Sequence, residues 1–381
     1  MIKNLRLKNF KCFGNSPIFN FSTINLLTGI NGRGKSTLLQ SILILAQSLN
    51  RGGDLNKLII NDEFVDLGNY DDIRNSDIKK EENIQFDFEI TDLVTNKVSV
   101  TFGEDENNAR LARCNGIVYS GHQMGGNQVD GKIHNDFLIP FFSAIRKTHF
   151  ISADRLGPVK YVDKTNLPEF IHVGPRGENT INILANSDKL APVNDSLYLG
   201  NDSKSIIQQA TEWLSYILEG ARIQVRGREN ESSVLYMLLN NRPNSYNYKP
   251  ANVGFGYSYV LPIIVTGLIA KPGEIIILEN PEAHLHPRAQ SRIGEFLVRV
   301  ASSGIQVFIE SHSEHILNSI RVCSLKPDFA LKPNDISIIY FNESFSPESL
   351  LLTEKGKIPN WPAGFFDQQD IDLSDIFRFS R

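Results

Sequence analysis

The stretch INLLTGINGRGKSTLLQSILIL, residues 24–45, decides the fold class of this chain. Its apolar start predicts a buried strand, and the apolar residues from Leu38 onward recur at helical spacing. The segment between them, Gly29–Thr37, fits G-x-x-x-x-G-K-[ST], in which successive backbone N–H groups and a helix N-terminus bind phosphate. We therefore expect Lys35 to reach the β- and γ-phosphates of a nucleotide and Ser36 to bind Mg²⁺. The expected nucleotide-binding residues of this loop are Asn31, Gly32, Arg33, Gly34, Lys35, Ser36 and Thr37.

Composition favours a folded soluble protein. The chain has 381 residues, of which 41% are hydrophobic and 22% charged. A net charge of −4 argues against a globally basic nucleic-acid binder, although a local basic groove stays open. Three distant cysteines suggest neither a disulfide framework nor a thiolate zinc site, and no signal peptide or membrane span is recognised. We expect a cytoplasmic protein without membrane contact.

Hydrophobic patterns predict an α/β domain over residues 1–345 and a short tail over 346–381. Residues 253–343 alternate helices with buried strands of a mostly parallel sheet. Residues 84–150 alternate apolar and polar side chains, which predicts an antiparallel β subdomain. Residues 204–250 begin with helical periodicity and are interpreted as a helical insertion.

A second acidic stretch, IIILENPEAHLHPRAQ (residues 275–290), follows one of these strands. Glu279 would hold Mg²⁺ together with Ser36, since carboxyl ends of parallel strands meet at one edge of a sheet. Asn280 stands where many ATPases carry a catalytic acid, and an amide cannot act as a base. Catalysis would then depend on Glu282, on Glu279, or on Lys35 with Mg²⁺.

Two further segments add polar groups to this edge. The turn in ANVGFGYSYV (residues 251–260) leads into an apolar helix, with Gly254, Gly256 and Ser258 as candidate phosphate contacts and Ser258 as the helix cap. In GIQVFIESHSEHIL (residues 304–317), His312 follows a buried strand and could bond a γ-phosphate or position water.

Together these segments resemble the ABC-type ATPases of the RecF, SMC and OLD group. The resemblance extends to a bacterial AAA-type family with a short C-terminal domain of unknown function, through the blocks VDLGNYDDI, ISADRLGPVKY, HVGPRGENT, VGFGYSYVLPIIV, ENPEAHLHP, SHSEHILN and WPAGFFD. It implies an ABC-type P-loop NTPase head with a mixed β-sheet, an antiparallel β subdomain and a helical insertion. It also implies that Gly254, Gly256 and Ser258 form the signature that contacts ATP on an opposite protomer, and that His312 is the His switch.

By this resemblance the protein is an ATPase in which two ATP–Mg²⁺ join a head-to-head homodimer, or a higher assembly built from it. Because Asn280 replaces the acid, we expect slow hydrolysis, with a clamp that does not hydrolyse as the alternative. The expected role is that of ATPase subunit in an antiviral defence system against phage, with a separately encoded effector such as a nuclease. The alternative is a RecF-like clamp that binds DNA in repair.

Some residues keep a second interpretation. His284 and His286, with Glu282 and His312, could form a transition-metal site instead of a dimer interface. Arg155 and Arg176 lie in Gly/Pro-bracketed turns, where they could contact phosphate or a partner, or stabilise the turn through a salt bridge. A nuclease domain of OLD type is not expected in the residues that follow His312.

Overall fold

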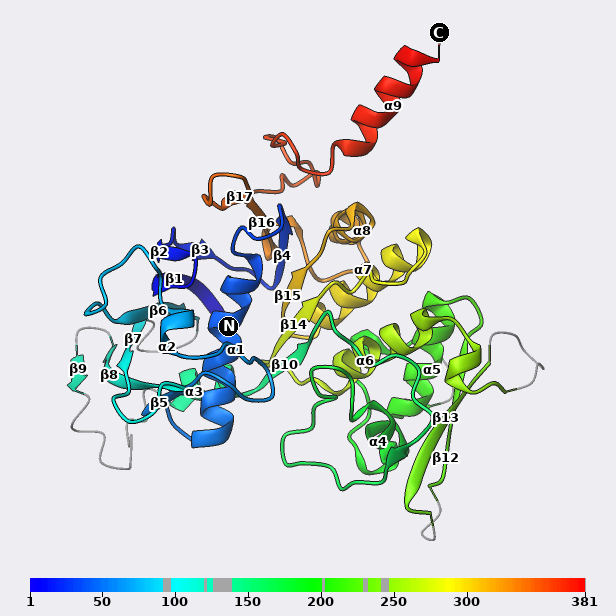
Figure 1. The fold of residues 1–381 in the computed structure, drawn as a ribbon. Coiled ribbons are helices and arrows are strands. Elements are labelled where there is room, and N and C mark those ends of the chain that lie inside the picture. Colours follow the sequence, from blue (N-terminus) through cyan, green and yellow to red (C-terminus); the bar gives the residue numbers. More distant parts are fainter. Residues whose placement is uncertain are drawn as a thin grey trace.

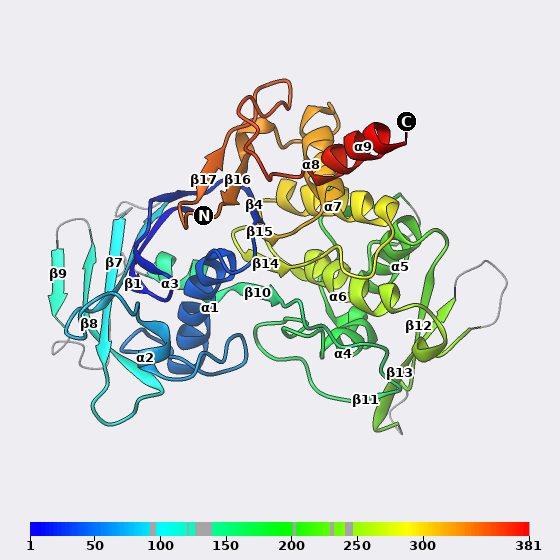
Figure 2. The ribbon, with the colours of Figure 1, turned by 45° about the horizontal axis from the view of Figure 1, so that its top comes forward.

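The computed structural model describes residues 1–91, 97–119, 122–125, 139–200, 203–228, 232–240 and 247–380. Among the described residues, three β-sheets and the helices around them form two lobes, with the mixed central sheet between them (Figures 1 and 2).

The central sheet is mixed. Its order is β10-β14-β15-β4-β16-β17, in which neighbours are parallel except for the antiparallel pair at the β17 edge. The strands are β4 (Ile24–Gly29), β10 (Thr148–Ile151), β14 (Ile275–Glu279), β15 (Gln306–Glu310), β16 (Ile336–Phe341) and β17 (Glu348–Leu350). Continuous apolar runs such as Ile275–Leu278 are buried because helices or the second sheet cover both faces.

The second sheet is antiparallel and has eight strands, in the order β2-β1-β6-β7-β8-β5, with β3 on β1 and β9 on β8. They are β1 (Ile2–Phe10), β2 (Phe13–Asn15), β3 (Phe19–Asn20), β5 (Lys57–Ile59), β6 (Ile84–Ile90), β7 (Lys97–Glu104), β8 (Leu111–Tyr119) and β9 (His122–Gly125). The apolar residues of β6 are buried and alternate with half-buried polar ones. The antiparallel sheet is confirmed, but it also takes strands from before residue 84, whereas β10 joins the central sheet.

Helix α1 (Lys35–Gly52) packs in a core shared with the antiparallel sheet and one face of the central sheet. Helices of the other lobe share a core with the opposite face. They are α4 (Thr180–Ala185), α5 (Ile206–Ile217), α6 (Phe255–Ile269), α7 (Pro287–Ser302) and α8 (Glu314–Leu325). The short helices α2 (Tyr70–Ile73) and α3 (Ile139–Arg146) lie in the first lobe.

The insertion at 204–250 is not wholly helical. After α5 it forms an antiparallel pair, β12 (Arg222–Arg226) and β13 (Val234–Asn240), and β11 (Val162–Asp163) adds to β13. The helical periodicity at the start therefore did not extend through the insertion, and the polar segments 227–233 and 240–250, also expected as loops, lie partly outside the described residues.

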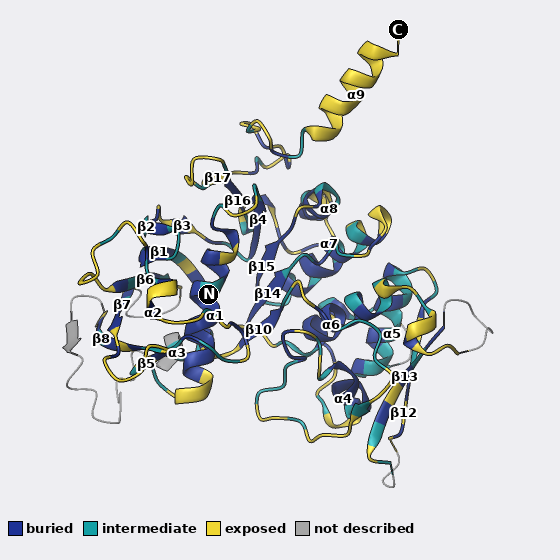
Figure 3. Ribbon diagram, viewed as in Figure 1, coloured by how far each residue is buried: buried dark blue, intermediate teal, exposed yellow. Residues whose placement is uncertain are grey.

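The tail returns to the central sheet through β17, and Phe365 packs edge-on against Tyr340 and Trp361. Helix α9 (Gln368–Phe379) then extends away from the body with no buried residue (Figure 3). No helix among the described residues is both long and apolar enough to cross a membrane.

Candidate nucleotide site

The phosphate loop joins β4 to α1, and its glycines are required by geometry. Gly29 has φ 119° and Gly34 has φ 105°, values that side chains with a Cβ rarely adopt. A Cβ on Gly29 would lie 2.3 Å from the carbonyl oxygen of Phe341, and one on Gly34 would lie 2.6 Å from Phe13 Cζ. The glycines therefore let the backbone turn tightly into the helix.

Lys35 lies inside this loop. It is 3% exposed, and its Nζ donates to the carbonyl oxygens of Gly29 and Ile30, both at 2.9 Å. Burial lowers the Lys35 pKa, and the Glu310 carboxylate opposes that effect. The ammonium is thus held by weak acceptors at the place where the loop would receive an anion.

The other loop residues divide by exposure. Asn31, Gly32 and Ser36 are exposed, whereas Thr37 is buried and its Oγ1 lies 3.5 Å from Cys12 Sγ. The guanidinium of Arg33 stacks over the Phe345 ring, 4.5 Å from its centroid.

A carboxylate that the sequence interpretation missed lies next to Ser36. Ser36 Oγ is 3.2 Å and 3.4 Å from the two carboxylate oxygens of Glu310, the last residue of β15. Glu279 was expected beside Ser36, but β15 lies between β14 and β4, so its terminal residue is the nearer one. The signal was present, since Glu310 ends an apolar strand just as Glu279 does.

Glu279 and Glu310 are partners in register at the ends of adjacent parallel strands. Burial, followed by the charge of Glu279, raises the pKa of Glu310 to about 7. Burial also raises the Glu279 pKa, and a hydrogen bond that the Ala153 amide donates to Oε2 (3.0 Å) offsets only part of this rise. Two carboxyl groups therefore lie side by side at the carboxyl ends of these strands, where few positive charges offset them.

Arg155 holds the turn that follows β14. The residue is 2% exposed, and its guanidinium donates to the carbonyl oxygens of Glu279 (2.9 Å) and Asn280 (2.5 Å). Burial lowers the Arg155 pKa to about 10. Asn280 itself has φ 44°, a left-handed conformation that asparagine tolerates, and its backbone amide donates to the Glu310 carbonyl (2.8 Å).

Arg176 has the turn-stabilising role that was one of its two interpretations, because its Nε lies 3.1 Å from Asp154 Oδ2. Arg155 neither forms such a pair nor lies free for a phosphate. Its contact with two backbone carbonyls could not be read from the sequence.

Glu282 and His312 are brought together. The Glu282 carboxylate accepts hydrogen bonds from Ser311 Oγ (2.9 Å) and from the His312 amide (2.8 Å). His312 is exposed, and partial burial of its ring and the charge of Lys35 lower its pKa. Glu282 therefore fixes the backbone that carries His312, with both carboxylate oxygens engaged.

The glycine turn begins α6, but Ser258 does not cap that helix. Gly254 is the N-cap residue, and Ser258 lies one turn further on, where its Oγ is buried without a hydrogen-bond partner among the described residues. A Cβ on Gly256 would lie 3.1 Å from the carbonyl oxygen of His284, so the turn packs on the segment after β14. Gly254 stays exposed.

The two histidines of the acidic stretch do different work. The His284 ring packs against Tyr259 and Phe255, at 4.6 Å and 5.6 Å between centroids, whereas His286 caps α7 by accepting from the Arg288 amide. Within the described ranges, no group of three or more His, Cys, Asp or Glu side chains could hold a metal ion. The transition-metal interpretation therefore gains no support.

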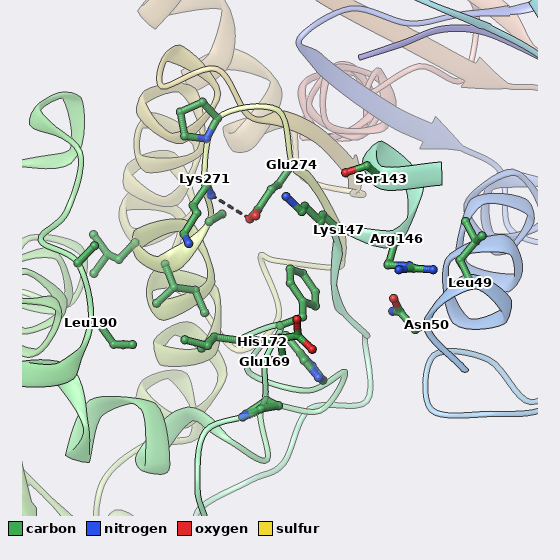
Figure 4. A pocket seen from close by; sticks show the side chains of 18 of the residues that line it. Leu49, Asn50, Ser143, Arg146, Lys147, Glu169, His172, Leu190, Lys271 and Glu274 are labelled. Carbon is green, nitrogen blue, oxygen red and sulfur yellow. Dashed lines mark hydrogen bonds between the residues drawn. The ribbon is translucent and has the colours of Figure 1, made fainter. Parts of the chain in front are cut away.

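A cavity of about 1430 Å³ lies elsewhere, between the end of α1 and the segments around His172 and Lys271 (Figure 4). Its lining residues Lys147 and Glu274 immediately precede β10 and β14. The phosphate loop follows the carboxyl end of β4, whereas this cavity lies at the amino ends of β10 and β14. The cavity and the candidate site are therefore at opposite ends of the parallel strands.

Comparison with protein families finds three matches along the chain. Residues 4–150 match a family of AAA domains, and residues 157–318 match an AAA-domain family described as candidate AbiEii toxins of type IV TA systems. Residues 331–376 match a family of proteins of unknown function, DUF3696.

Three curated relatives match shorter segments. An uncharacterized protein of Methanocaldococcus jannaschii is 28% identical over 150 residues, covering 34% of this chain and 18% of its own length. An ATP/GTP phosphatase of Helicobacter pylori is 47% identical over 45 residues, 12% of each chain. The Old nuclease of Escherichia phage P2 is 39% identical over 59 residues, 14% of this chain and 10% of its own. The matches thus span less than a fifth of each relative.

Solved structures show the fold. An SMC head bound to the C-winged helix domain of ScpA has a TM-score of 0.52 at 11% identity, covering 92% of this chain and 97% of the other. An SMC head with an extended coiled coil, bound to the C-terminal domain of ScpA derived from Pyrococcus furiosus, also gives 0.52, at 12% identity over 99% of both chains.

Proposed function

Because this chain belongs to the ABC-type AAA ATPases of the RecF, SMC and OLD group, we propose that it binds ATP with Mg²⁺, hydrolyses it slowly and dimerises around two nucleotides. The observation that carries the proposal is the convergence of Lys35, Ser36 and two strand-end carboxylates, buried Glu310 and half-buried Glu279, at the carboxyl ends of the strands. That edge offers an ammonium and loop amides for phosphates, and oxygen donors for a divalent cation.

The donor set fits Mg²⁺, a hard cation that prefers oxygen ligands. Ser36 Oγ and the carboxylates of Glu279 and Glu310 would hold it, and burial raises the pKa of both carboxyls, an effect that a bound cation would oppose. When bound, the ion would neutralise charge on the transferring phosphate. Lys35 would exchange two backbone carbonyls for phosphate oxygens, and His312 would lie nearby.

Slow turnover follows from the residues after β14. Asn280 can orient water through its amide but cannot accept its proton. Glu282 accepts two hydrogen bonds from the Ser311–His312 segment, which suits a positioning role better than that of a general base. Catalysis would then rest on positioning and on electrostatic stabilisation of a loose transition state.

Dimerisation is supported by the exposed start of α6. Gly254 is solvent-exposed at the amino end of a 15-residue helix, where backbone amides and the helix dipole favour an anion. In the proposed dimer this turn, Gly254–Gly256, faces the γ-phosphate bound to the partner copy. ATP would then supply much of the affinity between copies, because each nucleotide is bound from both sides.

The proposed setting is defence against phage, with this chain as the ATPase and a separately encoded effector, such as a nuclease, as its partner. Support comes from the family described as AbiEii-type toxins and from the relative named a phage nuclease. Hydrolysis would release the dimer and so act as a switch on the effector.

The direct test measures ATP binding and dimer mass for the wild type, Lys35→Ala and the control Lys355→Ala, a change at an exposed tail lysine. We expect Lys35→Ala to lose both nucleotide binding and ATP-dependent dimerisation, while the control keeps them. If Lys35→Ala dimerises with ATP as the wild type does, the proposal is refuted.

The setting is tested by purifying tagged protein from its native operon and by phage challenge of cells that carry the operon. A co-purified effector and protection that Lys35→Ala abolishes are expected. ATP-dependent binding to duplex DNA, with no effector and no protection, would instead favour the RecF-like clamp.

A further inference from the structure

The C-terminal helix α9 presents an apolar side to solvent. None of its residues is buried, and the helix extends away from the body (Figures 1 and 3). Leu373, Ile376 and Phe379 recur every three residues, so they lie along one side of the helix, and they are 54%, 63% and 77% exposed. Exposed apolar side chains grouped in this way mark a surface that binds another protein.

The start of α9 is anchored, which sets the direction of the helix. The Gly364 amide donates to Asp367 Oδ2 (2.8 Å), directly before the first helical residue. Phe365 is buried and packs edge-on against Tyr340 and Trp361. The helix therefore leaves a packed turn and does not lie back on its own chain.

A second exposed apolar surface lies beside this turn, at the carboxyl end of α8. It is formed by Val322 and Leu325, which are three residues apart and about half exposed. Arg321 joins this end of α8 to the tail, because its Nε donates to the Gly356 carbonyl oxygen (2.8 Å) and its guanidinium lies 5.9 Å from the centroid of the Trp361 ring. The α8 surface and the anchor of α9 are therefore neighbours.

The two surfaces carry opposite charge. On α9, acidic residues outnumber basic ones, with Asp370, Asp372 and Asp375 against Arg378. Around the α8 surface, basic residues outnumber acidic ones, with Arg321, Lys326, Lys355 and Lys357 against Asp328 and Glu354. The lysines at 355 and 357 belong to this surface because they flank Gly356, where a Cβ would lie 3.0 Å from Leu325 Cδ1. Opposite charge around two apolar centres favours their association and selects one surface for the other.

We propose that α9 of one copy binds the α8 surface of a second copy, and the reverse, in a dimer that needs no nucleotide. Both halves of the contact lie side by side on every chain, so a single two-fold axis satisfies both. The α8 surface is at the end of the helix opposite to Glu314, which follows the His312 segment of the nucleotide site. This interface is therefore separate from the one proposed around ATP, and the two together would join ATP dimers into a larger assembly.

The first test measures the mass of the full chain by sedimentation velocity in EDTA, without nucleotide, across a dilution series. We expect the wild type to dimerise. Ile376→Asp on α9 and Val322→Asp on α8 should each raise the dimer dissociation constant by about 10-fold or more, because a charge replaces an apolar side chain buried in the interface. Ser374→Asp is the matched control on the opposite side of α9 and should dimerise like the wild type, as should Lys35→Ala.

Disulfide cross-linking identifies what α9 binds. Ile376→Cys and Val322→Cys proteins are mixed and oxidised, so that only contact between copies joins the two different chains. Each variant mixed with the wild type controls for the native cysteines. We expect a cross-linked pair of the two variants.

Several outcomes would overturn the inference. It fails if the wild type stays monomeric throughout the series, if Ile376→Asp dimerises like the wild type, or if a chain carrying both cysteines cross-links only within itself. It also fails if Lys35→Ala weakens the association, because the interface measured would then be the nucleotide one. Loss of ATP binding in the wild type would overturn the proposed function and leave the tail dimer standing.

Discussion

Replacing Arg155 by Met should destabilise the fold strongly, because the guanidinium holds the turn after β14 from a buried position. It donates to the carbonyl oxygens of Glu279 and Asn280. A hydrogen bond that involves a charged group makes a net contribution of about 1.5–3 kcal/mol to stability. Two such bonds predict a loss of about 3–6 kcal/mol, a large part of the about 5–15 kcal/mol that stabilises a typical domain.

Urea denaturation followed by circular dichroism measures this loss. Arg176→Met is the matched control, since its ion pair with Asp154 is solvent-exposed and should be worth at most about 1 kcal/mol. Arg155→Lys should recover only part of the stability. Its ammonium can still donate to a carbonyl, but it lacks the planar fork that spans two carbonyls. If the free energy of unfolding of Arg155→Met lies within about 1 kcal/mol of the wild-type value, the turn is held by other contacts and the reasoning is refuted.

Three further predictions concern the same edge of the sheet. In EDTA, the stability of Glu310→Gln relative to the wild type should increase by about 3 kcal/mol as pH rises from about 4.5 to 8. Folding raises the Glu310 pKa to about 7, so the folded wild type loses this proton at a cost that the glutamine variant does not have. Urea unfolding at several pH values measures the difference in stability, and a difference that does not change with pH would contradict the prediction. Asn280→Asp should raise phosphate release about 10-fold or more by adding a base, and an unchanged rate would exclude this position from the chemistry. Gly34→Ala should lower the free energy of unfolding by about 2–4 kcal/mol, because an alanine there has an unfavourable φ and its Cβ clashes with Phe13. Gly32→Ala, whose Cβ has no atom within contact distance, should lose less stability. Thermal unfolding compares the two variants, and equal losses would contradict the steric argument.

The fold class could be predicted from the sequence because its signals are local. The residues from Ile24 to Leu45 specify strand, loop and helix by their apolar pattern and by the phosphate-loop motif, and β6 shows its alternation directly. The insertion was harder. Periodicity identified α5, but β12 and β13 are short and separated by polar residues, so they were included in a helical insertion rather than recognised as strands.

The site could be predicted only where residues act through their own neighbours in sequence. Lys35 belongs to the loop it fills, and its position was expected. Glu310 was missed because its closeness to Ser36 depends on which strand lies beside β4, and strand order is not written in any single segment. Arg155 was ambiguous for the same reason, since its partners are carbonyls more than a hundred residues away in sequence.

The position of β4 also sets when the site can form during synthesis. This strand, at residues 24–29, is paired on one side with β15 and on the other with β16, which ends at Phe341. The carbonyl of Phe341 accepts from the Ile30 amide inside the phosphate loop. A ribosome must therefore release most of the chain before its first motif is complete, and until then β4 presents two unpaired edges of the kind that chaperones cover.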